Sequence, residues 1–269
     1  MSNISVVSLI NEYERRQHID SLFDAHNLDF SYFDAINKFQ IDDTLKKYDL
    51  TINTDRMSLG EVACYLSHYC LWQQVIEYNL PYLMVFEDDI YFSKSAKTIL
   101  NNLDWLPDSF DVIKLETMYD RVMINRGTSL LLGHKLCQMQ SRHMGMAGYI
   151  ISQKGVRKLL AMTKMLGVDR QVDHIMFDRL ILEKGSSVHQ VFPALCIQDK
   201  IYNKDSIQFQ SELENERSSL QVIEEKVFGL KKVNKEFTRV FKQLLPKNMY
   251  YKGWLFVKGY KKQKITYFE

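Results

Sequence analysis

The chain has 269 residues, of which 46% are hydrophobic and 25% are charged, and its formal net charge at pH 7 is +2. An apolar content of this size supports a packed core and excludes an intrinsically disordered chain. No stretch reaches the about 18 consecutive apolar residues of a membrane-spanning helix, and the first residues carry no secretion signal, so we expect a cytoplasmic protein.

The cysteines and the distribution of charge add two constraints. Residues 228–269 contain 11 Lys and Arg but 2 Asp and Glu, whereas residues 1–227 contain 24 and 31. A basic C-terminal segment predicts an anionic partner for that segment. The cysteines show no paired metal spacing, which predicts buried thiols in a reducing compartment. They are Cys64, Cys70, Cys137 and Cys196.

Strand and helix patterns alternate along the first 205 residues. Short apolar runs predict strands, at residues 4–10, 30–36, 82–86, 111–116 and 144–152. Helical periodicity predicts helices, at residues 11–22, 59–76, 95–103 and 152–162. This alternation is typical of an α/β fold with a mostly parallel sheet.

The intervening and terminal segments have weaker patterns. Residues 37–58 are polar, which predicts a loop with short helical pieces, and residues 117–143 are expected to form a second loop. Both are candidates for acceptor-binding or lid loops. A soft boundary near residues 203–212 divides the chain into an α/β domain, 1–205, and a helical, basic C-terminal extension, 206–269.

The most informative stretch is an apolar run that ends in three adjacent carboxylates, Tyr82-Leu-Met-Val-Phe-Glu-Asp-Asp-Ile-Tyr91. In open α/β sheets the carboxyl end of a strand faces the ligand crevice. Oxygen-rich sites of this kind suit Mg²⁺ or Mn²⁺, and such an ion can neutralise the charge of a departing diphosphate. The alternative interpretation is a solvated turn or a helix N-terminus, where acids are also favoured.

Further segments resemble glycosyltransferase family 25, the enzymes of bacterial lipooligosaccharide synthesis. They appear in the family's order and cover about residues 4–200, most of the chain. The matching segments are Ile4-Ser-Val-Val-Ser-Leu9 with Arg15-Arg16, Phe33-Asp-Ala-Ile36, Leu59-Gly-Glu-Val-Ala-Cys-Tyr-Leu-Ser-His68 with Leu71-Trp72, Val85-Phe-Glu-Asp-Asp-Ile90, Ala147-Gly-Tyr-Ile-Ile-Ser152 with Leu159-Leu160, Val172-Asp-His174 and Pro193-Ala-Leu-Cys-Ile-Gln198.

The resemblance implies a GT-A-type, Rossmann-like nucleotide-binding domain and an inverting transfer of a hexose from a UDP-sugar, chiefly UDP-galactose. It also implies Mn²⁺ (or Mg²⁺) held by a DxD-like motif, which here begins with Glu87. The acceptor would be a lipid-linked lipooligosaccharide at the inner membrane of a Gram-negative bacterium, and no nucleic-acid partner is expected.

The resemblance also implies roles for the three acids and for the first strand. Asp89 would ligate the metal. Glu87 would contact the ribose or a metal-bound water, and Asp88 would do either or cap the following turn. The backbone of Ser8 and Leu9 would meet the uracil.

Residues of the first helix and second strand are further donor-site candidates. Arg15 and Arg16 could pair with the diphosphate, as guanidinium groups do well, although a solvated helix face explains Arg16 nearly as well. Asp34 closes the second strand, where a carboxylate can accept a hydrogen bond from the ribose or base.

Two helical side chains and two glycines complete the donor-site candidates. Glu61 and His68 lie seven residues, or about two turns, apart on one helix and could line the same crevice. A single histidine on a helix is more often a hydrogen-bonded structural residue, which is the alternative role for His68. Gly145 and Gly148 would let the backbone approach a sugar closely, with a plain tight turn as the alternative.

An inverting transfer needs a base on the acceptor side. The first candidate is Asp173, as base or acceptor-orienting group, with the adjacent His174. Its rivals are Asp169, Asp178 and Glu116. His189 or His174 could complete the metal shell, since imidazole tolerates Mn²⁺.

The basic tail and the function of the chain each have more than one interpretation. Aromatic residues among the tail lysines suit an anionic membrane surface, and nucleic-acid binding or packing on the domain are the alternatives. Rival functions are a Mg²⁺-dependent phosphohydrolase or nucleotidyltransferase and a non-catalytic saccharide-binding protein. The chain has no Walker-type phosphate loop, which disfavours one branch of the first rival.

Overall fold

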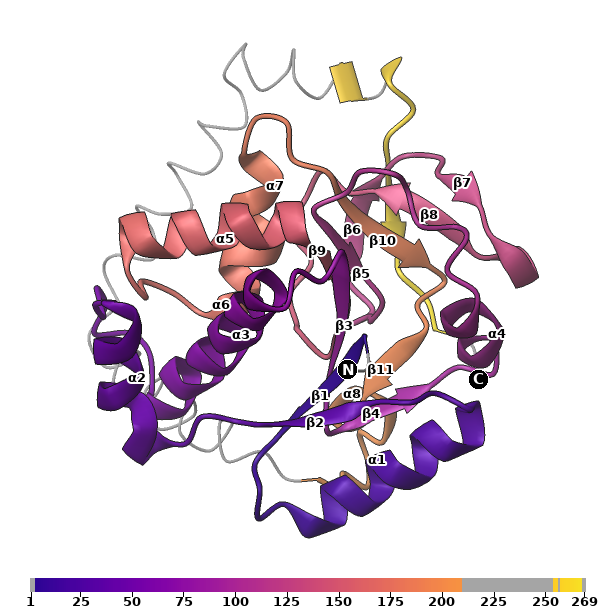
Figure 1. Cartoon of the computed structure of the whole chain (residues 1–269). Coiled ribbons are helices and arrows are strands. Elements are labelled where there is room, and N and C mark those ends of the chain that lie inside the picture. Colours follow the sequence, from indigo (N-terminus) through magenta and orange to yellow (C-terminus); the bar gives the residue numbers. More distant parts are fainter. Residues whose placement is uncertain (1–2, 210–253, 256, 268–269) are drawn as a thin grey trace, which may run out of the picture.

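The computed structural model describes residues 3–209, 254–255 and 257–267. Within them, an eight-stranded sheet has the strand order β2-β1-β3-β9-β5-β10-β8-β7, with helices on both sides (Figure 1). The strands are β1 (Ile4–Ser8), β2 (Ser31–Asp34), β3 (Tyr82–Glu87), β4 (Ile90–Phe92), β5 (Val112–Lys114), β6 (Arg121–Ile124), β7 (Thr128–Ser129), β8 (Lys135–Gln138), β9 (Gly148–Ser152), β10 (Val188–Phe192), β11 (Cys196–Gln198) and β12 (Lys261–Lys264).

The helices cover the sheet and its edges. They are α1 (Tyr13–His26), α2 (Ile41–Tyr48), α3 (Leu59–Glu77), α4 (Ala96–Asn101), α5 (Gln153–Leu166), α6 (Val172–His174), α7 (Leu180–Leu182) and α8 (Asp199–Tyr202). Short 3₁₀ turns lie at Lys38–Gln40 and Leu131–Gly133, and one π-helical turn lies at Ile175–Arg179.

Most strands of the main sheet run in one direction, as the sequence predicts. β2, β1 and β3 are mutually parallel, and β5 and β10 are parallel to each other. β9 runs antiparallel between β3 and β5, so it interrupts the parallel order without changing the direction of its neighbours. β8 also runs in the opposite direction, and β7 returns to the common one. The prediction of an α/β fold with a mostly parallel sheet is therefore confirmed.

Two apolar clusters on opposite sides of the sheet explain this layered fold. α3 and α5 pack with inward residues such as Val7, Val85 and Ile151. α1 and α4 pack with the alternate residues, such as Val6 and Phe86. Because successive side chains of a strand point to opposite faces, a strand that is apolar on both faces is covered on both sides.

The start of α3 is fixed by a capping box. The Ser58 hydroxyl accepts from the Glu61 backbone N–H, and the Glu61 carboxylate accepts from the Ser58 backbone N–H over 3.0 Å. These bonds satisfy two of the donors that a helix leaves unpaired at its N-terminus. They place the first turns of α3 beside the carboxyl ends of β1 and β3 (Figure 1).

The two predicted loops differ in outcome. Residues 37–58 contain the 3₁₀ turn and α2, as expected for a loop with short helices. Residues 117–143 contain β6, β7 and β8, so the prediction of a loop is wrong for these three segments. Those strands are short and partly exposed, which weakens the alternating pattern that identifies a strand.

The C-terminal extension is largely outside the described residues. Its last described part is a strand, because β12 pairs antiparallel with β6, and Figure 1 shows this yellow segment alongside β6. The prediction of a helical extension is therefore wrong for residues 261–264. Ile265 is fully buried, and its carbonyl accepts from Thr117 Oγ1 over 2.7 Å, so this segment packs on the α/β domain. Within the described ranges, none of the helices combines the length and the apolar character that a membrane span requires.

Candidate active site

A cavity of about 580 Å³ opens where the carboxyl ends of β1 and β3 meet the first turns of α3. The register explains its position, because Val7 of β1 lies beside Glu87 of β3 and Ser8 lies beside Asp34 of β2. Its wall contains five groups of residues: the end of β1 with α1, the loop after β2, the first part of α3, the acidic end of β3, and the segments around β9, α6 and α8. The polar and charged lining residues are Ser8, Asn11, Glu12, Arg15, Asn37, Lys38, Glu61, Ser67, Glu87, Asp88, Asp89, Gln171, Asp173, Gln198 and Lys200.

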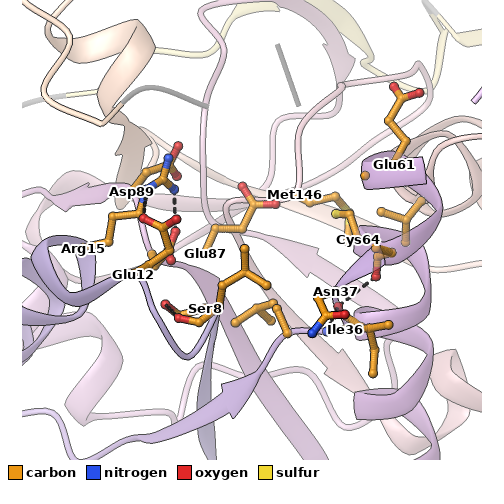
Figure 2. A pocket seen from close by; sticks show the side chains of 18 of the residues that line it. Ser8, Glu12, Arg15, Ile36, Asn37, Glu61, Cys64, Glu87, Asp89 and Met146 are labelled. Carbon is orange, nitrogen blue, oxygen red and sulfur yellow. Dashed lines mark hydrogen bonds and ion pairs between the residues drawn. The ribbon is translucent and has the colours of Figure 1, made fainter. Parts of the chain in front are cut away.

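The three predicted acids all line this cavity, and Figure 2 shows two of them, Glu87 and Asp89, in it. Arg15 Nη1 donates to Asp88 Oδ1 over 2.7 Å. Gln198 Nε2 donates to Glu87 Oε2 over 2.7 Å and to Asp89 Oδ1 over 3.3 Å. Arg15 and Gln198 therefore hold the carboxylates in one group and leave them only partly neutralised.

The electrostatics of this group suit a cation. Burial, followed by the charges of Asp89 and Glu116, raises the pKa of Glu87 to about 8. Burial raises the pKa of Asp89 to about 6, although Arg15 opposes this shift. Buried carboxylates that repel each other are penalised when ionised, and a bound cation removes that penalty. Glu87 and Asp89 thus fit a hard divalent ion such as Mn²⁺ or Mg²⁺.

The first-strand candidates separate into two groups. Ser8, Leu9 and Arg15 line the cavity. Arg16 does not line it, because its guanidinium donates to the Ser8 carbonyl over 3.1 Å and to Asp34 Oδ1 over 2.5 Å. Asp34 is exposed and does not line the cavity, so the prediction that it contacts the ribose or base is wrong. Instead, the ion pair of Asp34 with Arg16 joins the ends of β1 and β2.

Two candidates on α3 also have structural roles. Glu61 lines the cavity, and besides capping α3 it accepts from Gln171 Nε2 over 3.1 Å. His68 is fully buried, and its Nδ1 lies 2.8 Å from the Tyr149 hydroxyl. Burial lowers the pKa of His68 to about 3, so its ring is neutral. Because His68 does not line the cavity, the prediction that it lines the same crevice as Glu61 is wrong.

The two predicted glycines serve different purposes. Gly145 lines the cavity with φ of +94°, a conformation that favours glycine. Gly148 does not line it. A Cβ at Gly148 would lie 2.4 Å from Cys196 Sγ and 3.2 Å from the ring of Phe86. The correction is that Gly148 allows close packing inside the sheet rather than the approach of a sugar.

Among the predicted bases, Asp173 lines the cavity. Its Oδ2 accepts from the Gly145 backbone N–H over 3.1 Å. Its Oδ1 is buried and has no hydrogen-bond partner among the residues that the structure describes. An oriented carboxylate with an unoccupied oxygen is suited to accept a proton from a bound hydroxyl.

The rival bases and His174 do not line this cavity. Asp169 is held by Arg179 over 2.8 Å, and Glu116 is paired with Lys114 in the core over 2.8 Å. His174 Nδ1 lies 3.8 Å from Asp178 Oδ2. His174 follows Asp173 directly, and a helix turns about 100° per residue, so the two side chains point in different directions. The prediction that His174 acts beside Asp173 in the catalytic site is therefore wrong.

The structure also contradicts the prediction that His189 completes the metal shell. It lies on β10, three strands from β3 in the sheet. At about 4.8 Å per strand, its backbone is roughly 14 Å from β3. His189 does not line the cavity, and it does not complete a metal shell with Glu87 and Asp89. A single histidine outside any motif does not reveal, from the sequence, which strand of the sheet it will occupy.

Sequence reasoning gave no role to Gln198, Lys200, Gln171 or Cys64, which all line the cavity. Gln198 ends β11, and its contacts with two acids depend on the pairing of β11 with β4 directly after the acidic motif. The charge of Lys200 lowers the pKa values of Glu87 and Asp89. A polar residue at a strand end is the signal that could have identified Gln198.

An acidic group, an arginine and a separate carboxylate lie together at the carboxyl edge of this α/β sheet, where ligands bind in open α/β folds. Comparison with known proteins specifies the family. Residues 1–176 match glycosyltransferase family 25 (LPS biosynthesis protein). The chain therefore belongs to glycosyltransferase family 25.

Its relatives come from Gram-negative bacteria. A putative glycosyltransferase of Haemophilus influenzae is 33% identical over 92% of this chain and 88% of the relative. The Haemophilus influenzae lipooligosaccharide biosynthesis protein lic2B is 31% identical over 82% of this chain and 85% of the relative. The lacto-N-neotetraose biosynthesis glycosyltransferase LgtE of Neisseria meningitidis serogroup B is 34% identical over 74% of this chain and 75% of the relative. These similarities extend beyond the cavity to most of the chain.

Proposed function

We propose that this protein transfers a hexose, with galactose the first candidate, from a UDP-sugar to a sugar of a lipid-linked lipooligosaccharide, with inversion at the transferred carbon. One observation carries the proposal: the acidic group Glu87–Asp89 shares a cavity with Arg15 and Asp173. The relatives support the acceptor class, since their names assign them to lipooligosaccharide and lacto-N-neotetraose biosynthesis.

On the donor side, Asp89 and Glu87 would hold a divalent cation, Mn²⁺ or Mg²⁺, whose charge stabilises the departing diphosphate. Arg15 lines the same cavity and already contacts Asp88, so its guanidinium can turn toward a phosphate without leaving the site. The ends of β1 and of the loop after β2 supply the wall on which the base and ribose would rest.

On the acceptor side, Asp173 is the proposed general base. Its Oδ1 would take the proton of the acceptor hydroxyl while the hydroxyl oxygen attacks the anomeric carbon. The bond from that carbon to the diphosphate oxygen breaks in the same step, and UDP leaves with the electron pair. The Gly145 N–H bond to Oδ2 keeps the carboxylate oriented during this transfer. A single displacement of this kind inverts the configuration of the sugar.

The location of the enzyme belongs to the same proposal. The acceptor class requires contact with the inner membrane from the cytoplasmic side. Lys261, Lys262 and Lys264 are exposed on β12, where they can face anionic headgroups. Co-sedimentation with anionic vesicles at low salt, and not with neutral ones, tests this peripheral association.

The proposed function is tested by incubating the full chain with a panel of UDP-sugars and a lipooligosaccharide acceptor, with Mn²⁺. We expect UDP and a lengthened acceptor as products with a UDP-hexose. The Asp89→Asn variant should lose transfer by at least about 100-fold, because it removes a charge from the group that would hold the cation. Cleavage of the donor to UMP and sugar 1-phosphate would indicate a phosphohydrolase instead, and undiminished transfer by the variant would refute the assignment of Asp89.

A further inference from the structure

A thiol, an imidazole and a carboxylate that could ligate a metal lie close together at the inner side of this cavity. Cys64, His68 and Glu87 each offer one ligand atom, and these atoms all lie within 4.8 Å of one another. Cys64 and His68 are four residues apart on α3 and therefore lie on one face of the helix. In Figure 2, Glu87 points into the space between Asp89 on one side and Cys64 on the other.

His68 provides the observation that makes this cluster a site. Its Nδ1 is occupied by the Tyr149 hydroxyl over 2.8 Å. Its Nε2 is buried and has no hydrogen-bond partner within the described part of the chain. A buried ring nitrogen without a partner costs free energy unless something binds it. When Nδ1–H donates to Tyr149, Nε2 carries the lone pair that a metal requires.

The ligand types select the metal. A thiolate, an imidazole and a carboxylate match the protein ligands of Zn²⁺ sites that keep a fourth position open, and they do not match the all-oxygen preference of Mg²⁺. Tetrahedral Zn²⁺, with bonds of about 2.0 to 2.3 Å, needs ligand atoms roughly 3.5 Å apart. Side-chain rotation of the half-buried Cys64 and Glu87 can bring their ligand atoms from within 4.8 Å to this shorter separation. Tyr149 meanwhile keeps His68 oriented.

We propose that Cys64, His68 and Glu87 form a binding site for a thiophilic divalent ion, Zn²⁺ or Co²⁺, that is separate from the proposed donor-metal position. Binding forms the bond from Cys64 Sγ to the metal, and the thiol proton goes to solvent. Glu87 is the shared residue. A Zn²⁺ ion that engages Glu87 withdraws it from Asp89 and from its hydrogen bond with Gln198.

This sharing predicts a consequence that rests on the proposed function: Zn²⁺ should inhibit sugar transfer, and added Mn²⁺ should relieve the inhibition. The binding itself does not rest on that function. A protein that binds Co²⁺ through Cys64 but transfers no sugar would refute the proposed function and leave the site intact.

The site is tested by titrating the full chain with Co²⁺ and following the charge-transfer absorption of a thiolate–Co²⁺ bond. We expect this absorption in the unmutated protein and in Cys70→Ser, whose thiol lies on the same helix but outside the cavity. It should be absent in Cys64→Ser. Glu87→Gln should bind Co²⁺ at least about tenfold more weakly, and so should Tyr149→Phe, through loss of His68 orientation.

A second measurement avoids any loss of folding in the variants. In the unmutated protein, Zn²⁺ should slow the alkylation of Cys64, measured by mass spectrometry of the digested chain, far more than the same concentration of Mg²⁺ does. The proposal is overturned if the charge-transfer absorption is absent from the unmutated protein or persists in Cys64→Ser. Equal alkylation of Cys64 with and without Zn²⁺ would also overturn it.

Discussion

At the scale of single residues, the site combines carboxylates with different surroundings. Asp88 is paired with Arg15, whereas Glu87 and Asp89 both accept from the side-chain amide of Gln198. Asp173 stands apart, oriented by one backbone N–H. Environments that differ in this way let neighbouring carboxylates serve different chemical roles.

Asp173→Asn should lower kcat for transfer by about 10²- to 10⁴-fold, the usual contribution of a general base. The KM for the UDP-sugar should change little, because Asp173 is proposed to act on the acceptor. Steady-state kinetics measure both constants. The matched control is Asp178→Asn, a rival acid that does not line the cavity, which should retain transfer. Equal loss in both variants would contradict the role of Asp173.

The raised pKa of Glu87, about 8 against an ordinary 4.5, predicts a pH dependence of stability without metal. The folded chain binds this proton more tightly than the unfolded chain, so stability falls as pH rises from 4.5 and levels off above about 8. Burial lowers the pKa of His68 from 6.5 to about 3. This group therefore makes stability rise with pH, but only below pH 6.5.

The informative window is therefore pH 6.5 to 8, bounded by the ordinary pKa of histidine and the raised pKa of Glu87. We expect the Tm of the metal-free protein to fall across this window, and Glu87→Gln to flatten the slope. Thermal melts in EDTA at several pH values provide the measurement. A Tm that rises with pH in the unmutated protein would contradict the raised pKa of Glu87. An equal slope of Tm against pH in the Glu87→Gln variant would also contradict it.

At the scale of elements, β9 and its glycine position the site. β9 runs between β3 and β5, and Gly148 lies beside Phe86, directly before the acids. A side chain at Gly148 would displace Cys196 and the ring of Phe86. The acidic motif therefore depends on close packing beneath it.

Gly148→Ala should lower the free energy of unfolding by about 1–3 kcal/mol, the usual cost of overpacking a core. Denaturant unfolding measures this change. In the double variant Gly148→Ala/Cys196→Ala the cost should be smaller than the sum of the two single changes, because the main clash is removed. A stable Gly148→Ala protein with weakened UDP binding would instead favour a direct role of Gly148 at the sugar.

The elements also show why parts of the site could be predicted from the sequence. The apolar runs around Val7 and Val85 identify β1 and β3, and their carboxyl ends place Ser8 and Glu87 at one edge. His189 and Asp34 were misassigned because their environment depends on pairing partners far along the chain. Gln198 was overlooked for the same reason, since β11 joins β4 only in the folded protein.

At the scale of the whole molecule, two apolar layers hold a sheet whose carboxyl edge carries the chemistry. The α/β fold class and the position of the site at the carboxyl edge of the sheet could be predicted, because the periodicity of apolar residues in strands and helices is a local property of the sequence. The antiparallel insertion of β9 and the strand β12, which returns from the C-terminal segment to β6, are long-range pairings. No local pattern of residues encodes such pairings.

The central claim is that Glu87 and Asp89 hold a cation that in turn holds a nucleoside diphosphate. Isothermal titration of the full chain with UDP, with Mn²⁺ and then with EDTA, tests it most directly. We expect UDP binding with Mn²⁺ to be at least about tenfold tighter than without it, and this difference to disappear in Asp89→Asn. UDP affinity that is the same with and without Mn²⁺ in the unmutated protein would contradict the claim.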